Sequence, residues 1–325
     1  HLLFGPPAPD CVTCAAAPLA VPPRATGAGA LIGIIDIGTA FWNPRFAPGG
    51  VAQFRSVSFL HFTGSGGRGG AATDHTVLGP AEIDALCATA GRPGGDRLVR
   101  AELAARFPQS IHAGPDRLGA QMGHGTAMAD LAGRGGAPLF GLELPRAVLE
   151  DSTGSALEAV LVPAIREVVA RMQADPAAGR DTRMLVLLAF ACAGGPQEGS
   201  RPASGVLTDL MASPGMAGGT LVLPMGNHRA SATHARAAMP QALGWALPPD
   251  DHSLNTVELF HFSPAARLRL TDPTGRAADW TLPAGPGLAL LRQGGQTVGM
   301  AWQSEPEPGA RRPPPPSVAG TRSTW

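Results

Sequence analysis

The sequence contains no lysine and no tyrosine, so all 25 of its basic residues are arginine. They are balanced by 25 acidic residues, and the formal net charge is zero. A chain without net positive charge lacks the electrostatic footprint of proteins that bind nucleic acids or anionic membranes, and we predict neither partner. Glycine (43 residues) and proline (33) are abundant instead. We interpret this bias as an effect of codon composition rather than of function.

Long apolar runs are also missing. None approaches the roughly 18 residues that a membrane span requires, which predicts that no segment crosses a membrane. Residues 1–30 show no basic start followed by a long apolar stretch, so no intact signal peptide is visible. The sequence begins with His1 rather than Met, as expected of a mature protein, a trimmed chain or a fragment.

Cysteine is scarce, with four residues in 325. Cys11 and Cys14 are close enough to form a small disulfide loop if the protein is exported, or to supply half of a metal site. A zinc site would need a second pair of ligands at suitable spacing, and the sequence offers none. We therefore predict no metal and no cofactor.

Composition and patterning divide the chain into four segments. A Pro/Ala/Gly-rich lead-in precedes an α/β pattern, which gives way to short alternating runs with turn signals and then to a Pro-rich end. The expected segments are a lead-in at 1–29, an α/β domain at 30–228, a β-rich insertion at 229–303, and a linker and chain end at 304–325.

Strand and helix patterns alternate within the second segment, which predicts an α/β fold with a doubly wound, mostly parallel sheet. The run Leu31–Ile37 is continuous and β-branched, as in a strand buried on both faces. Further strands are expected at 138–144, 183–191 and 219–225, and helices at 80–87, 96–107, 155–173, 205–211 and from His124. Antiparallel strands are expected later, at 256–262, 267–271, 287–292 and 296–302.

Two ionisable residues stand at marked points of this pattern. Asp36 ends an apolar strand, where a buried carboxylate is costly unless a group such as imidazole pairs with it. The alternative is that it only caps the following loop. His124 begins a helix between small residues that let a substrate approach the ring, and Thr126 is expected to satisfy groups of the first turn. A solvated surface histidine is the alternative.

Two later segments follow buried strands. Asn227 ends the run LVLPMGN, where a turn residue is the simple explanation. Cys192, Ala193 and Gly194 follow the strand at 183–191, and Cys192 is interpreted as a small buried side chain rather than a nucleophile.

The four segments, taken in chain order, resemble the subtilisin-like serine proteases. Asp36-Ile-Gly is similar to the family's Asp-Thr-Gly, and His124-Gly-Thr-Ala-Met-Ala is similar to its His-Gly-Thr-x-x-Ala, although Asp130 stands where members usually have Gly. Gly226-Asn227 resembles the family's Gly-Asn, and the segment from Cys192 resembles its Ser-Leu-Gly-Gly.

The resemblance implies a subtilisin-like fold and peptide-bond hydrolysis by an Asp/His/Ser triad. It assigns Asp36 and His124 to the triad, Asn227 to the oxyanion donor, and Cys192, Ala193 and Gly194 to the backbone that binds a polypeptide substrate. It also implies a secreted or cell-envelope protein.

The family's nucleophile motif, Gly-Thr-Ser-x-Ala, does not occur. The nearest match is Gly320-Thr321-Arg322-Ser323, which leaves Ser323 as a weak candidate. A better alignment places Ser323 shortly upstream of the missing motif. We therefore expect a chain that stops before its serine and has little or no peptidase activity itself.

Two other functions fit parts of the sequence. A catalytically inactive relative would act as a peptide-binding or scaffold module, with 229–303 as its contact surface. A nucleotide-dependent enzyme is suggested by Gly27-Ala28-Gly29, but these glycines precede the first strand, whereas phosphate-binding glycines follow it.

Overall fold

The structure is a computed structural model that describes part of the chain. The described residues are 29–63, 72–114, 123–151, 154–179, 181–190, 202–216, 218–224 and 244, and four strands between 267 and 303. The chain divides into two units, one formed by His1–Gly195 with Pro202–Thr256 and the other by Pro196–Arg201 with Val257–Trp325.

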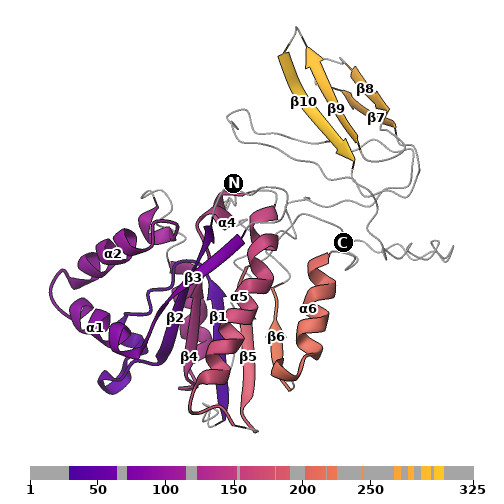
Figure 1. Ribbon diagram of the computed structural model, residues 1–325. Coiled ribbons are helices and arrows are strands. Elements are labelled where there is room, and N and C mark those ends of the chain that lie inside the picture. Colours follow the sequence, from indigo (N-terminus) through magenta and orange to yellow (C-terminus); the bar gives the residue numbers. More distant parts are fainter. Residues whose placement is uncertain are drawn as a thin grey trace, which may run out of the picture. The chain divides into compact units, whose positions relative to one another are not determined.

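The first unit is built on a six-stranded sheet with the order β3-β2-β4-β1-β5-β6 (Figure 1). All neighbouring strands are parallel except β2 and β3. The strands are β1 (Ala30–Asp36), β2 (Phe54–Thr63), β3 (Ala72–Leu78), β4 (Leu139–Glu143), β5 (Arg183–Leu188) and β6 (Thr220–Val222). The expected α/β fold with a mostly parallel sheet is confirmed.

Helices connect the strands, as parallel pairing requires. They are α1 (Pro80–Ala90), α2 (Gly95–Arg106), α3 (His124–Gly133), α4 (Ala147–Glu150), α5 (Ser155–Ala174) and α6 (Pro202–Ala212), with 3₁₀ turns η2 (Pro44–Phe46), η3 (Pro48–Gly50), η4 (Ile111–Ala113) and η7 (Pro214–Met216). The expected helices at 80–87, 96–107, 155–173, 205–211 and from His124 are confirmed.

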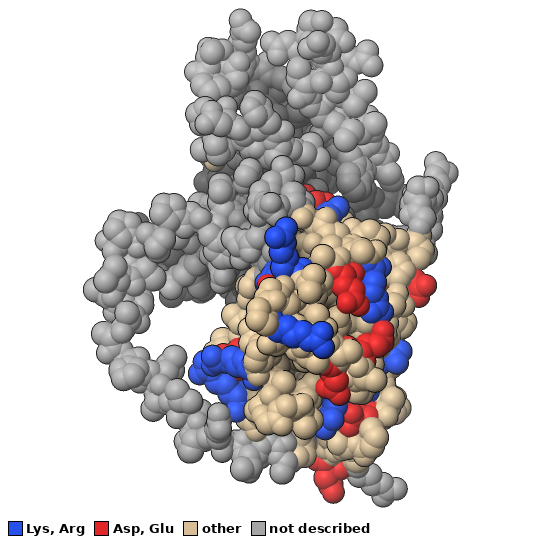
Figure 2. All heavy atoms as spheres, turned by 90° about the vertical axis from the view of Figure 1, so that its left-hand side faces the viewer, with Lys and Arg blue, Asp and Glu red and all other residues tan. Residues whose placement is uncertain are grey.

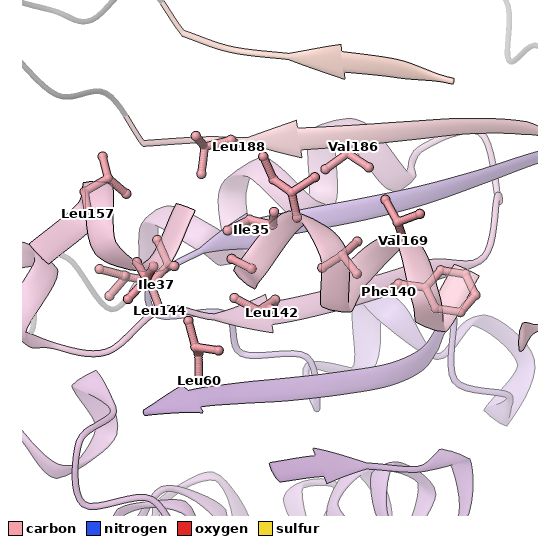
Figure 3. Packing of buried hydrophobic residues seen from close by; sticks show 14 of the residues in the cluster. Ile35, Ile37, Leu60, Phe140, Leu142, Leu144, Leu157, Val169, Val186 and Leu188 are labelled. Atoms are coloured by element: carbon pink, nitrogen blue, oxygen red, sulfur yellow. The ribbon is translucent and has the colours of Figure 1, made fainter. Parts of the chain in front are cut away.

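The central strand β1 is buried on both faces because helices cover both. Leu31 and Ile35 pack in a core that includes Val168 of α5, and Figure 3 shows side chains of this cluster between α5 and the sheet. Ile34, one position out of phase, packs in a second core that contains residues of α1, α2 and α3. Since side chains alternate along a strand, Asp36 shares the α3 face with Ile34.

Two strands of the first unit were not expected from the sequence. In the chain, β2 and β3 come after β1 and before α1. β3 pairs antiparallel with β2 at the edge of the sheet. β3 reads ATDHTVL, whose polar residues suit an edge position but hide the strand from hydrophobic periodicity. β5 and β6 are also shorter than expected, ending at Leu188 and Val222.

The described residues of the second unit form two antiparallel pairs of strands. β7 (Arg267–Thr271) pairs with β8 (Ala277–Thr281), and β9 (Gly287–Gln293) pairs with β10 (Gln296–Gln303). The expected strands at 267–271, 287–292 and 296–302 are confirmed, and β8 is additional. The strand expected at 256–262, the lead-in up to residue 28 and the chain end from 304 lie outside the described residues.

The side of the first unit that carries α1 and α2 presents both signs of charge, with arginine next to acidic side chains (Figure 2). Arg106 pairs with Glu82 at 2.9 Å, and Arg100 with Asp96 at 2.7 Å.

Within the part of the chain that the structure describes, no helix has the length and apolar character needed to span a membrane.

Candidate functional site

Asp36 and His124 meet on the α3 face of the sheet. Asp36 is the last residue of β1, and His124 is the first residue of α3. His124 Nδ1 lies 2.9 Å from Oδ1 and 2.9 Å from Oδ2 of Asp36. Two residues separated by 88 positions in the sequence therefore form a hydrogen-bonded carboxylate–imidazole pair.

The Asp36 carboxyl is buried, with 1% of its side chain exposed. Its Oδ1 also accepts a hydrogen bond from the Ile37 backbone N–H at 2.7 Å, which fixes its orientation. Burial raises the pKa of Asp36, and the hydrogen bonds from His124 and Ile37 oppose that rise because they favour the charged form. Loss of His124 would leave this carboxyl buried without its main partner.

The His124 ring is 40% exposed. The hydrogen bond to Asp36 raises the pKa of the imidazole, and partial burial opposes that rise. With Nδ1 donating to Asp36, Nε2 has no hydrogen-bond partner among the residues that the structure describes. A neutral ring that donates from Nδ1 leaves Nε2 free to accept a proton, as a general base requires.

Two glycines allow β1 and α3 to approach each other. Gly38 turns the chain after Asp36 with φ +76°, a conformation that side chains disfavour. Gly125, directly after His124, lies against this turn. A Cβ at position 125 would stand 2.4 Å from Thr39 Oγ1 and 3.0 Å from the Ile37 carbonyl oxygen. Only glycine fits there without displacing the turn.

Thr126 binds the turn rather than its own helix. Its hydroxyl accepts from the Ala40 N–H at 2.8 Å and donates to the Gly38 carbonyl at 3.1 Å. The helix has no side-chain cap at Gly123, so the expectation that Thr126 satisfies first-turn groups is wrong. The reason is that the turn after Asp36 lies close enough to take both bonds. The Gly125 N–H adds a third link, to the Ile37 carbonyl at 3.1 Å.

Glu143 is a part of the site that the sequence reasoning missed. It ends β4 directly opposite Asp36 in the parallel register, and its side chain is 2% exposed. The carboxyl accepts from the Gly38 N–H at 2.8 Å and from the Thr39 N–H at 3.3 Å. Burial raises the pKa of Glu143 to about 8, against the two backbone hydrogen bonds. The sequence does contain a pattern that could have indicated Glu143, because an acidic residue ends the apolar run LFGLE as Asp36 ends its own strand.

His112 of η4 lies beside Glu143. Its side chain is 1% exposed, and Nε2 is 3.9 Å from Glu143 Oε1, too far for a hydrogen bond. Neither ring nitrogen has a hydrogen-bond partner among the residues that the structure describes. Burial lowers the pKa of His112 to about 4, so the ring is neutral at pH 7. Trp42 packs edge-on against it at 5.4 Å between ring centroids.

Asp130, the departure from the family pattern, lies on the exposed side of α3. It pairs with Arg45 and, at 3.6 Å, with Arg134. Asp130 and Arg45 border an open hollow at the start of α3, which is also lined by Ala40, Asn43, Arg100, Gly123, Thr126 and Ala127. Asp130 therefore takes part in surface ion pairs and makes no hydrogen bond to Asp36 or His124.

The other expected site residues lie outside the described residues. They are Asn227, Cys192, Ala193, Gly194 and the candidate nucleophile Ser323. Cys87 of α1 is described, and burial raises the pKa of its thiol, which disfavours the reactive thiolate. Among the described residues, no three His, Cys, Asp or Glu side chains gather in a group that could hold a metal ion.

Comparison of the chain with protein-family models, with curated proteins and with solved structures finds no match. The assignment of function therefore depends on the residues and geometry of the site.

Proposed function

We propose that this chain carries most of the catalytic domain of a subtilisin-like serine endopeptidase. The observation that carries the proposal is the Asp36–His124 pair, with Nδ1 at 2.9 Å from the carboxylate and the ring partly exposed. In a serine peptidase the carboxylate holds the imidazole in the tautomer whose Nε2 accepts the nucleophile's proton, and it stabilises the imidazolium that forms. The substrate would be a polypeptide.

The position of the pair supports the subtilisin-like class. The acid ends the central strand of a mostly parallel sheet, and the base begins a helix on one face of that sheet. Open α/β sheets place their sites at the carboxyl ends of the strands. The order Asp36, His124, Asn227 in the chain agrees with this class, and Asn227 would donate to the oxyanion.

The proposal assigns the nucleophile to a Gly-Thr-Ser-x-Ala segment encoded beyond Trp325. Attack by that serine on the scissile carbonyl would pass its proton to His124 Nε2, and His124 would return the proton to the leaving amine. Asp36 would stay ionised throughout. The 325-residue chain alone would then hydrolyse peptides little or not at all.

A protease assay on the gene product extended to its natural stop codon tests the proposal. Cleavage of an unstructured protein such as casein should be measured for the extended protein and its His124→Ala variant. His61→Ala is the matched control, since His61 lies on β2 away from Asp36. Activity that disappears in the first variant and survives in the second supports the enzyme. No cleavage, with no Gly-Thr-Ser-x-Ala segment in the extension, would favour the inactive peptide-binding module.

A further inference from the structure

Glu143 is linked by strand pairing and hydrogen bonds to the segments that carry Asp36 and His124. It lies opposite Asp36 on the neighbouring strand, with both side chains on the α3 face. Its carboxyl holds the backbone N–H groups of Gly38 and Thr39, the turn that follows Asp36. Buried N–H groups need such partners, because an unsatisfied donor in the interior has lost the hydrogen bond that water gives it in the unfolded chain.

The same turn supports the first turn of α3. Thr126 exchanges hydrogen bonds with Gly38 and Ala40, and the Gly125 N–H binds the Ile37 carbonyl. Because Gly125 has no side chain, the helix backbone rests directly on the turn. A displacement of residues 37–39 would therefore move both Asp36 and the helix end that carries His124.

We propose that Glu143 is a positioning residue for the Asp36–His124 pair, acting through its hold on the turn at residues 37–39. This inference rests on the proposed function only for its catalytic meaning. The hydrogen bond and the proton affinity of His124 can be measured without peptidase activity.

The charge state of Glu143 matters because Asp36 is its neighbour. Burial and the Asp36 charge keep the pKa of Glu143 near 8, so the carboxyl is protonated at neutral pH and places no second negative charge beside Asp36. Among the described residues, the other titratable group facing Glu143 is His112 of η4, with Nε2 3.9 Å from Oε1. The His112 ring is neutral above about pH 4, and its pKa is influenced by Arg100 and Asp96 of α2. Ionisation of Glu143 at alkaline pH would add negative charge next to Asp36 and strengthen the proton affinity of His124.

Selective ¹⁵N-histidine labelling of the full chain allows the test, with the His124 signal assigned by its loss in His124→Gln. Four proteins are compared by NMR between pH 5 and about pH 10: the unmodified chain, Glu143→Gln, Glu143→Leu and Glu167→Gln. Glu167 is the matched control because it is also a buried acid of the first unit, but it binds Ser58 and Arg171 instead of the turn.

The unmodified chain and Glu167→Gln should show a low-field Nδ1–H resonance of His124 and a second inflection of its ring signals near pH 8. Glu143→Gln should keep the resonance and lose the inflection. Glu143→Leu should lose the resonance, with the proton affinity of His124 reduced roughly three- to tenfold.

A folded Glu143→Leu chain with the resonance and proton affinity of the unmodified chain would overturn the inference. If Glu143→Leu does not fold, persistence of the inflection in Glu143→Gln would overturn it. Failure of the proposed function is distinguishable from failure of this inference. In that case the extended protein would not cleave peptides, but the NMR signals of His124 would still change as expected.

Discussion

The imidazole of His124 and the carboxylate of Asp36 form a hydrogen-bonded pair, with Nδ1 2.9 Å from both carboxylate oxygens. The acid is buried and the base is partly exposed. The buried Asp36 carboxylate favours a proton on Nδ1 of His124, and the exposed part of the ring leaves Nε2 accessible. A general base in a serine peptidase needs this arrangement.

Replacement of Asp36 by Asn should lower the pKa of His124, because the hydrogen bond that His124 donates to the Asp36 carboxylate is the main cause of its rise. NMR titration of the chain measures this directly. If the gene product extended to its stop codon is the proposed peptidase, the same change should reduce its kcat by about 10⁴-fold, the size seen for the corresponding change in another serine protease family. An unchanged His124 pKa would show that the pair is not formed in solution.

Replacement of Gly125 by Ala should destabilise the protein by about 1–3 kcal/mol, since the new methyl group would overlap the turn. The nearest atom, Thr39 Oγ1, would lie 2.4 Å from the Cβ. Denaturant unfolding gives the change in free energy. Gly123→Ala is the control, because a Cβ there meets nothing within 4 Å, and it should change stability by less than about 0.5 kcal/mol. Equal effects of the two substitutions would contradict the close approach of α3 to the turn.

His112 should make the protein less stable in acid. Its pKa falls from 6.5 to about 4 on folding, so the unfolded state binds more protons between these values. Stability from this residue is then lost as pH falls from 6.5 to 4, by about 1.4 kcal/mol per pH unit. His112→Phe should remove that loss, as measured by unfolding at several pH values. A slope that the substitution leaves unchanged would show that His112 is not buried as a neutral ring.

Glu143 should have the opposite pH dependence. Its pKa rises from 4.5 to about 8 on folding, so the folded state binds more protons in this window. The stability that the protonated carboxyl supports is complete below pH 4.5 and is lost as pH rises through 8. Glu143→Gln should therefore gain stability relative to the unmodified protein as the pH increases from 5 to 8. A constant difference between the two proteins across that range would contradict a raised pKa.

The sequence predicted the parts of the fold that depend on strong local patterns. The β-branched run around Ile35 gave β1, and the helical spacing of residues 155–173 gave α5. Asp36 and His124 could be selected because each stands at an element boundary with a recognisable motif. The two side chains meet because side chains alternate along β1, which places Asp36 on the face of the sheet that α3 covers.

Other features depend on tertiary contacts that no local pattern encodes. β3 was missed because an edge strand with polar residues such as Asp74 and His75 lacks a hydrophobic period. Glu143 was missed because its role depends on the register of β4 against β1, which brings two acids from positions 36 and 143 opposite each other. Thr126 was assigned to the wrong partner because its position suggested a helix cap, whereas the packed turn at 38–40 supplies both of its bonds.

A fluorophosphonate probe of active-site serines, applied to the gene product extended to its natural stop codon, shows directly whether Asp36 and His124 serve a serine nucleophile. Mapping of the labelled peptide should find one labelled serine, within a Gly-Thr-Ser-x-Ala segment after Trp325, and the label should be lost in His124→Ala. An extended protein that takes no label, or a label that persists without His124, would contradict the claim that Asp36 and His124 serve a serine nucleophile.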